Sequence, residues 1–438
     1  MSDSPLTIFW FRRDLRIEDN AGLYYALKEN RNVIPLFIFD TDIIDKLPSK
    51  QDPRLEFIHQ EITSIKHQLE KIGSSLWIKH GKPLEIFQDI IGNQTIKAVY
   101  ANHDYEPYSI HRDEQINKLL TANHISFNTF KDQVIFEKSE VTKKDGKPYT
   151  VFTPFSRAWM KEFNQVQIPK YDISDLRKNF HQAQPLAEIS LDTMGFAETE
   201  VPIPPKAINE DIIENYHDLR NYPAKNGTSR LGMHLRFGTI SVRDLVLKAA
   251  KTNQTYLNEL IWREFYMMIL WNFPHVVDHA FKPAYDFIEW RNDEKEFRAW
   301  CEGKTGYPIV DAGMRELNTT GYMHNRVRMI TASFLTKHLL VDWRWGEKYF
   351  GDKLLDYELS SNNGGWQWAA GSGCDAAPYF RVFNPELQTK KFDPNLKYIR
   401  SWVPELEDFG YPNPIVEHKY ARQRALDTYK KALDKVKQ

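Results

Sequence analysis

Residues 360–385 read SSNNGGWQWAAGSGCDAAPYFRVFNP, and the rest of the chain is best understood from this stretch. Trp366 and Trp368 are two residues apart, so on a helix they point in different directions, and we expect them to meet different surroundings. The pair of asparagines before them is typical of helix caps and turns. The pair of glycines lets the backbone approach a flat ligand closely or adopt a positive φ. A helix start with two packing tryptophans is the alternative interpretation.

The N-terminal part of the chain alternates short apolar runs with amphipathic ones. The apolar runs are TIFWF, VIPLFIFD, SLWIKHG and IKAVYAN, and the amphipathic runs include AGLYYALKEN, RLEFIHQEITSIKHQLEKI and PLEIFQDII. Continuous apolar strands that alternate with helical periods predict βαβ units and a parallel sheet covered on both faces. Segment 1–130 is therefore predicted to be an α/β domain of Rossmann-like type, although it lacks the GxGxxG fingerprint.

The spacing of apolar residues changes twice after residue 130. Residues 131–205 mix KKDGKP with VPIPPK, so we expect a long connector with one helical insert at FTPFSRAWMKEF. From residue 206 the pattern turns helical, in segments such as SVRDLVLKAAK, YLNELIWREFYMMILW and NRVRMITASFLTKHLL. Segment 206–438 is therefore predicted to be a mainly α-helical domain. Its basic end, ARQRALDTYKKALDKVKQ, is predicted to be a solvated terminal helix.

The composition limits the kinds of partner. A chain of 438 residues with a net charge of −1 has no overall attraction for nucleic acid, so a DNA-binding surface must gather its Lys and Arg on one face. Cys301 and Cys374 lack metal-ligand spacing, so we expect two buried thiols, no metal site and a reducing compartment. No basic signal region and no membrane-length apolar run is evident, so a soluble, cytoplasmic protein is expected.

Several long motifs together resemble the DNA photolyase and cryptochrome family. They extend from FWFRRDLRIEDN near the N-terminus to the stretch 360–385, and so cover nearly the whole chain. The resemblance implies that FAD lies folded against residues 360–385 in a helical C-terminal domain, and that the α/β domain can hold an antenna pigment at its edge. Arg12, Arg13 and Asp14, however, are better interpreted as a structural ion cluster at a strand end.

The loop NGTSRLGMHLRFG carries a glycine, two hydroxyls and a forked cation in succession. This combination suits a pyrophosphate, although a structural loop can have the same letters. In the family, this loop and an upstream tyrosine bind the FAD phosphates. By resemblance, the residues in question are Tyr216, Thr228, Ser229, Arg230, Leu231 and Gly232. Gly232 stands where serine is commoner in the family, which removes one hydroxyl contact.

In LNELIWREFY, Glu259, Trp262, Arg263 and Tyr266 follow at i, i+3, i+4 and i+7 and share one helical stripe. Such a stripe faces either solvent or a ligand. The large apolar indole of Trp262 is unfavourable on a solvent-exposed face. The resemblance implies that Glu259 hydrogen-bonds a base of a damaged dinucleotide and that Trp262 packs against it. It also implies that Arg263 contacts DNA.

In YMHNRVRMI, Asn325 and Met329 are four residues apart and share a helix face, which by itself is equally typical of helix packing. The resemblance implies that Asn325 touches the lesion, that Met329 lies beside it, and that Arg326 touches DNA. The residues implied on the cofactor side are Arg328 with its partner Asp356, Glu358 and Asn362.

Three tryptophans form a predicted route for electrons. Spacing alone says nothing about their contacts, but the resemblance places Trp366, Trp343 and Trp290 in a line from the flavin to the surface. It places Trp368 with Trp262 in the wall of the substrate pocket. The DNA-contacting arginines of the family correspond to Arg220, Arg263, Arg326 and Arg381.

The resemblance therefore implies light-driven repair of cyclobutane pyrimidine dimers in UV-damaged DNA, by a monomeric enzyme with reduced, anionic FAD. The predicted catalytic residues are Trp290, Trp343, Trp366, Asn362 and Glu259. Tyr108 and Ser109 stand where the folate-using branch has an Asn-Glu pair, which argues against a folate antenna and leaves the identity of any second chromophore open.

The kind of lesion follows from two positions. Asn325 and Met329 stand where (6-4) photolyases carry histidines, and neither side chain titrates near neutral pH, so cyclobutane dimers are favoured over (6-4) lesions. The alternative function is that of a cryptochrome, a light sensor that keeps FAD without repair. Against it, the sequence ends at Gln438 without a long tail, and Asn362 stands where plant cryptochromes carry Asp. A light-independent flavin reductase is weakened by the lack of a nicotinamide fingerprint.

Overall fold

The computed structural model describes residues 5–435, which form two compact units whose pieces alternate along the chain. The α/β unit holds the residues up to Glu137 together with Glu162–Ala207 and Arg230–Lys248. The helical unit holds Lys138–Lys161, Ile208–Ser229 and the residues from Ala249 onward. The three predicted segments are consecutive, so this interleaving is a feature that periodicity did not indicate.

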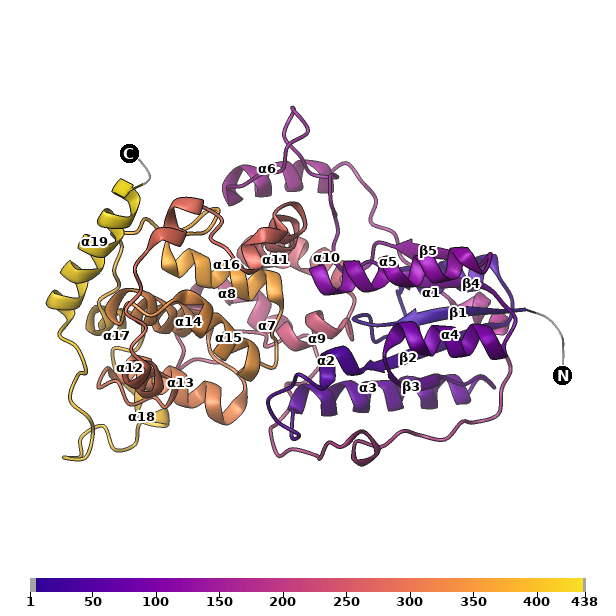
Figure 1. Cartoon of the computed structure of the whole chain (residues 1–438), viewed down its shortest axis with the longest axis horizontal. Helices are drawn as coiled ribbons and strands as arrows, with labels where there is room; N and C mark the ends of the chain where they lie inside the picture. The colour runs from indigo at the N-terminus through magenta and orange to yellow at the C-terminus, as the bar shows by residue number, and fades with distance from the viewer. Residues whose placement is uncertain (1–4, 436–438) are drawn as a thin grey trace. The chain divides into compact units, whose positions relative to one another are not determined.

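The sheet of the α/β unit has five strands in the order β3-β2-β1-β4-β5, and all neighbours pair in parallel (Figure 1). The strands are β1 (Leu6–Phe11), β2 (Val33–Asp40), β3 (Trp77–Gly81), β4 (Ile96–Asn102) and β5 (Ser126–Phe130). The helices are α1 (Ala21–Glu29), α2 (Thr41–Ile44), α3 (Pro53–Glu70), α4 (Pro83–Asn93), α5 (Pro107–Ala122), η1 (Ser174–Asn179), η2 (Asp192–Met194) and α9 (Gly232–Phe237). The predicted parallel α/β fold is confirmed, and β5 is a strand that the quoted apolar runs did not include.

Burial on both faces explains the continuous apolar runs. Every residue of β1 and β2 is buried. Because side chains alternate along a strand, Phe9 and Phe11 join the core on one face of the sheet, whereas Ile8 and Trp10 join the core on the other. Strands covered by helices on both faces need apolar residues at every position.

The ion cluster predicted at the end of β1 is present. Arg12 pairs with Asp113, and Arg13 Nη1 donates to Asp104 Oδ1 at 3.1 Å. Asp14 Oδ1 accepts the backbone N–H of Arg12 at 2.7 Å. These groups satisfy one another, so a structural role accounts for them.

A second cluster in the α/β unit is deeper. Asp132 is 1% exposed, accepts two hydrogen bonds from Arg16 (2.9 and 2.8 Å) and accepts one from Arg243 (2.9 Å). Burial alone would raise the pKa of this carboxyl, but Arg16 and Arg243 outweigh burial, and the pKa of Asp132 is lowered. The carboxylate is therefore held ionised inside the protein.

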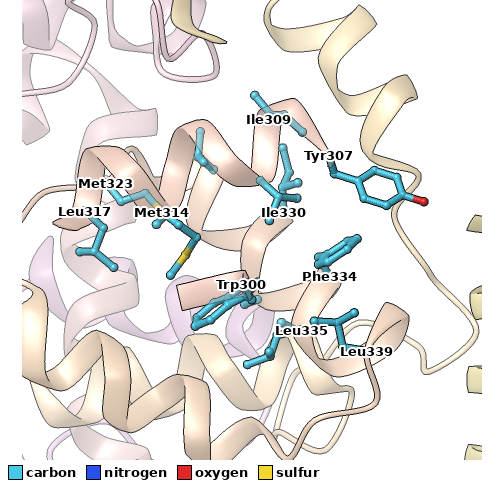
Figure 2. Packing of buried hydrophobic residues seen from close by; sticks show 14 of the residues in the cluster. Trp300, Tyr307, Ile309, Met314, Leu317, Met323, Ile330, Phe334, Leu335 and Leu339 are labelled. Atoms are coloured by element: carbon cyan, nitrogen blue, oxygen red, sulfur yellow. The ribbon is translucent and has the colours of Figure 1, made fainter. Parts of the chain in front are cut away.

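The helical unit contains most of the remaining helices. They are α6 (Phe152–Phe163), α7 (Glu210–Glu214), α8 (Tyr216–Leu219), α11 (Gln254–Asn272), η3 (Pro274–Val277), η4 (Pro283–Phe287), α12 (Glu294–Cys301), α13 (Pro308–Thr320), α14 (Asn325–Ser333), η5 (Phe334–His338), α15 (Trp343–Lys353), α16 (Leu359–Ala370), α17 (Pro385–Phe392), α18 (Lys397–Trp402) and α19 (His418–Lys435). α10 (Val242–Thr252) runs from one unit into the other. Figure 2 shows part of the core, where Trp300 of α12, Met314 of α13 and Leu335 of η5 belong to one cluster. The predicted helical domain is confirmed.

The structure corrects the prediction of caps and turns in residues 360–385. α16 begins at Leu359, and its cap is the carboxylate of Glu358, which accepts the N–H of Ser361 at 3.0 Å. The asparagine pair and the glycine pair lie inside the helix, and neither glycine has a positive φ. Packing outweighs helix propensity here, because a Cβ on Gly364 would collide with the ring of Tyr266.

The two thiols are less buried than predicted. Cys301 and Cys374 are free and half-buried. Burial raises the pKa of Cys301 to about 12 and that of Cys374 to about 11, so both remain protonated at neutral pH. Within residues 5–435, no helix combines the length and the apolar character needed to cross a membrane.

Candidate functional site

A cavity of about 400 Å³ lies in the helical unit. Its wall is formed by α11, α14, α15, α16 and the segment Leu354–Glu358. The predicted site residues that line it are Arg220, Glu259, Trp262, Arg263, Asn325, Arg328, Met329, Asp356, Glu358, Asn362, Trp366 and Trp368. The residues predicted for the substrate and several of those predicted for the cofactor thus share one cavity.

Other predicted residues are not among those that line the cavity. Within the helical unit they are Tyr216, Thr228, Ser229, Trp290, Arg326, Trp343 and Arg381. Arg230, Leu231 and Gly232 belong to the α/β unit. There, Arg230 has a left-handed φ of 53°, Leu231 is buried, and Gly232 is the first residue of α9.

The stripe predicted around Trp262 lies on α11 and faces the cavity. Glu259, Trp262, Arg263 and Tyr266 all line the cavity, which is the placement that a ligand-facing stripe requires. Arg220 Nη1 donates to Glu259 Oε1 at 2.6 Å. Burial raises the pKa of Glu259, and Arg220 reduces the rise because it favours the charged form. This carboxyl group is therefore fixed in place at the cavity wall.

α14 presents the second predicted pair. His324 caps the helix, and its Nδ1 accepts the backbone N–H of Arg326 at 3.1 Å. Asn325 and Met329, whose spacing predicted a shared helix face, both line the cavity. Arg326 is engaged elsewhere, because its Nη2 donates to Asn221 Oδ1 at 2.6 Å.

The predicted pair of Arg328 and Asp356 is present at the wall. Arg328 Nη2 donates to both carboxylate oxygens of Asp356, at 3.1 and 2.9 Å, and its Nε donates to the backbone oxygen of Met323 at 2.7 Å. Burial opposes the charge of Arg328, but Asp356 outweighs burial, and the pKa of Arg328 is raised. A fixed pair of opposite charges thus lines the cavity and can bind the polar edge of a ligand.

Asn362 is oriented by a residue that the sequence did not single out. Its side-chain amide donates to the backbone oxygen of Glu347 at 3.0 Å and to Glu347 Oε1 at 2.9 Å. With the amide hydrogens engaged, Oδ1 remains to accept a hydrogen bond in the cavity. Burial raises the pKa of Glu347 to about 7. Glu347 and Asn362 lie on different helices, so no periodic pattern would have revealed the pair.

Two glycines shape the cavity in different ways. A Cβ on Gly346 would collide with the ring of Trp366, so this glycine lets the indole pack against α15. A Cβ on Gly365 would meet nothing within 4 Å, although Gly365 lines the cavity. The indole N–H of Trp366 is buried and has no hydrogen-bond partner among the described residues. The cavity is therefore open beside the backbone of Gly365, and its wall contains the polar groups of Arg328 and Asp356. Such a space fits a flat ring system such as that of FAD.

Trp366 and Trp368 meet different ring neighbours, as predicted. Trp366 lies edge-on to Phe350, with 4.9 Å between ring centroids, and to Trp300 at 6.0 Å. Trp368 lies 6.4 Å from Phe383. Both indoles nevertheless line the same cavity, so their surroundings differ only in part.

The other two tryptophans of the predicted line differ in exposure. Trp343 is 2% exposed, as is Trp366, whereas Trp290 is half-buried. The ring of Trp290 lies 6.0 Å from that of Tyr429 on α19. The predicted outermost member of the line is therefore also the most exposed of the three.

Two hydroxyl groups of the predicted phosphate loop, those of Thr228 and Ser229, form hydrogen bonds with neighbouring tyrosines. Thr228 Oγ1 lies 3.0 Å from Tyr322 Oη, and Ser229 Oγ lies 2.9 Å from Tyr256 Oη. A Cβ on Gly227 would collide with the last residue of α8. Gly227 is therefore required by the close packing of the loop against α8.

The chain matches two family descriptions, DNA photolyase over residues 7–172 and the FAD binding domain of DNA photolyase over residues 256–410. It is similar to the deoxyribodipyrimidine photo-lyase of Halobacterium salinarum, with 36% identity over 98% of this chain and 99% of the relative. It is similar in structure to an archaeal photolyase from Sulfolobus tokodaii with two FAD molecules, at 38% identity and a TM-score of 0.84, over 97% of this chain and all of the other.

A cryptochrome from Synechocystis is also similar, at 25% identity and a TM-score of 0.83, over 98% of this chain and all of the other. The chain belongs to the DNA photolyase family and carries that family's FAD-binding domain. The family and the enzyme class predicted from the sequence are thereby confirmed.

Proposed function

We propose that this protein uses light to repair cyclobutane pyrimidine dimers in DNA. The observation that carries the proposal is a single cavity that joins Glu259 and Trp262, predicted for the lesion, to Asn362 and Arg328, predicted for the flavin. Relatives that match along their whole length carry the name deoxyribodipyrimidine photo-lyase. FAD in its reduced, anionic form supplies the light-driven one-electron chemistry that opens the cyclobutane ring.

On the substrate side, the protein receives a dimer that has left the duplex. Flipping costs a few kcal/mol of unstacking. Trp262 and Trp368 offset part of this cost, at about 1–3 kcal/mol for each stacked base. Glu259, held by Arg220, hydrogen-bonds a base edge, and Asn325 and Met329 complete the contact surface.

Arginines supply the contacts to the DNA backbone. The proposed residues are Arg220, Arg263, Arg326 and Arg381. Phosphate contacts position the DNA without reading its sequence, so binding should weaken steeply with added salt. A chain with a net charge of −1 can bind DNA in this way, because only the arginines that contact the phosphates need to be positively charged.

On the cofactor side, Asn362 is proposed to present Oδ1 to the N5–H of the flavin, because its amide hydrogens are held by Glu347. A neutral amide tolerates an anionic ring better than a carboxylate would. The charge pair Arg328–Asp356 and the carboxyl group of Glu358 border the same space. Contacts to the phosphates are assigned to Tyr216, Thr228, Ser229, Arg230, Leu231 and Gly232.

Trp366, Trp343 and Trp290 are proposed to pass electrons inward to oxidised flavin. Trp366→Phe should still bind FAD and still repair after chemical reduction, yet it should photoreduce oxidised flavin poorly. Absorbance during illumination measures this step. Normal photoreduction in the variant would remove Trp366 from the route.

The lesion class is supported by the chemistry of the wall. None of the described residues that line the cavity is a histidine. Opening a cyclobutane ring needs no general acid, whereas repair of a (6-4) lesion is thought to need one. The test is to illuminate the reduced protein with oligonucleotides that carry each lesion. Repair of the cyclobutane dimer alone is expected, efficient (6-4) repair would overturn the lesion assignment, and failure on both would favour the cryptochrome alternative.

A folate antenna is not part of the proposal. Tyr108 Oη donates to Asp40 Oδ2 at 2.6 Å, and Ser109 Oγ donates to Asp104 Oδ2 at 3.0 Å. Both positions are therefore engaged within the α/β unit. We infer that any second chromophore is of another kind.

A further inference from the structure

Part of the expected connector backs a wall of the cavity. Residues Lys138–Lys161 pack with the helical unit, and their helix α6 lies against α11 (Figure 1). Trp159 Nε1 donates to Glu264 Oε1 at 2.6 Å, and the rings of Phe155 and Phe265 are 5.2 Å apart. Because other residues of α11 line the cavity, α6 supports that wall from behind.

The first residue of α6 contacts a residue of the cavity wall directly. The ring of Phe152 is stacked on the indole of Trp262, with 3.7 Å between centroids and 6° between planes. Trp262 lines the cavity, whereas Phe152 is not among the lining residues. One face of the indole is therefore covered by the protein, and Phe152 sets the plane of the indole.

Phe152 is itself held in place. Its backbone N–H donates to Asp375 Oδ2 at 3.1 Å, and its ring meets that of Phe265 edge-on at 5.9 Å. Phe265 also meets the indole of Trp262 edge-on, at 5.6 Å. A rotation of the indole would therefore break one stacked and one edge-on contact.

We propose that Phe152 is a positioning residue for lesion binding, which holds the indole of Trp262 in the plane that a flipped pyrimidine base stacks on. The inference rests on the proposed function, because it takes Trp262 as the surface that receives the dimer. An indole that is already held loses little side-chain freedom when a base stacks on it. Loss of Phe152 should therefore weaken binding of the lesion and leave binding of undamaged DNA unchanged.

The test is dark binding of the FAD-loaded protein to a duplex with one thymine dimer and to the same duplex without it. Phe152→Leu keeps apolar volume but has no ring, and it should weaken dimer binding about fivefold to tenfold, the size of a lost aromatic contact. Phe152→Tyr keeps the ring and should bind within about twofold of the parent. Phe287→Leu is the matched control, because that side chain is 56% exposed on η4.

Three results would overturn the inference. They are unchanged dimer affinity in Phe152→Leu, equal losses on the two duplexes, and equal losses in the Leu and Tyr variants. A lowered FAD content in Phe152→Leu would likewise show a general structural role. If Phe152→Leu fails to fold, Asp375→Ala removes the acceptor for the Phe152 N–H, and it should lower dimer affinity in the same direction. A parent protein that does not prefer the dimer duplex would instead refute the proposed function itself.

Discussion

Burial has opposite outcomes for a carboxyl group in the deep cluster of the α/β unit and for one that lies behind the cavity wall of the helical unit. Around Asp132, Arg16 and Arg243 outweigh burial, and the pKa is lowered. At Glu347, burial prevails and the pKa rises to about 7. The charge of Asp132 is thus balanced by two near neighbours, whereas the carboxyl group of Glu347, which holds Asn362 from behind the cavity wall, has no ion pair that outweighs burial.

The largest effect is expected from breaking the deep cluster. Asp132→Ala leaves the guanidinium group of Arg16 buried without a carboxylate partner and leaves Arg243 with Asp19 alone, 2.9 Å away. The free energy of unfolding should fall by about 3–5 kcal/mol. Denaturant unfolding measures the loss. Glu18→Ala is the control, because its 2.7 Å pair with Arg177 is exposed and should contribute at most about 1 kcal/mol. Equal losses in the two variants would contradict the comparison.

The same cluster should make the protein sensitive to acid. Because the pKa of Asp132 is lowered in the folded state, its stabilisation is complete above the ordinary pKa of the carboxyl group. It is lost as the pH falls through the lower, folded value. Unfolding measured at decreasing pH should therefore show a smaller acid-dependent loss in Asp132→Ala than in the parent. Parallel pH profiles would mean that Asp132 is not held ionised.

An intermediate effect should separate the two glycines of the cavity. Gly346→Ala must displace the ring of Trp366 and should cost about 1–3 kcal/mol. Gly365→Ala should stabilise α16 by about 0.5–1 kcal/mol, because alanine is the better helix former. Its methyl group nevertheless enters the cavity, so FAD content should fall, while the melting temperature of the FAD-free protein should rise. Normal FAD content in Gly365→Ala would show that the flavin does not occupy the space beside Gly365.

The smallest effect is expected at Glu347, a carboxyl group for which burial raises the pKa. The pKa of Glu347 is raised from 4.5 in the unfolded chain to about 7 in the folded protein. The free energy of unfolding therefore decreases as the pH rises between these two values. Glu347→Gln keeps the acceptor for Asn362 and removes the titration. It should match the parent near about pH 4 and exceed it by on the order of 1 kcal/mol near about pH 8.

An exposed carboxylate provides the opposite control for Glu347→Gln. Glu289 lies 2.8 Å from Lys431 and 2.6 Å from Lys435, and hydrogen bonds to these lysines lower its pKa to about 2. Its stabilisation is present above the ordinary pKa, so Glu289→Gln should lower stability at neutral pH. Changes of the same sign in both variants would contradict the assignment at Glu347.

Features with local signals could be predicted from the sequence. The apolar runs gave strands, FTPFSRAWMKEF coincides with α6, and the stripe that contains Glu259 and Trp262 faces the cavity. In each case the pattern belongs to a single element, so periodicity within that element contains the information.

Features that depend on tertiary contacts could not be predicted. Glu347 reaches Asn362 from another helix, and Phe152 reaches Trp262 from a segment expected to be a connector. The asparagine pair suggested a cap or a turn and the glycine pair a positive φ, but both pairs lie inside a helix, where Gly364 is required by the ring of Tyr266. Contacts between distant segments leave no periodic trace in a single sequence.

The interleaved course of the chain also sets an order of events during synthesis. α6 leaves the ribosome early, yet Trp159 hydrogen-bonds a residue that follows 105 positions later. The α/β unit is complete only when Lys248 has been added, and α11 comes after it. Until then the apolar face of α6 has no helix to pack against, which exposes the nascent chain to aggregation. Nascent chains arrested before α11 should bind chaperones through α6, whereas chains arrested well beyond Asn272 should not.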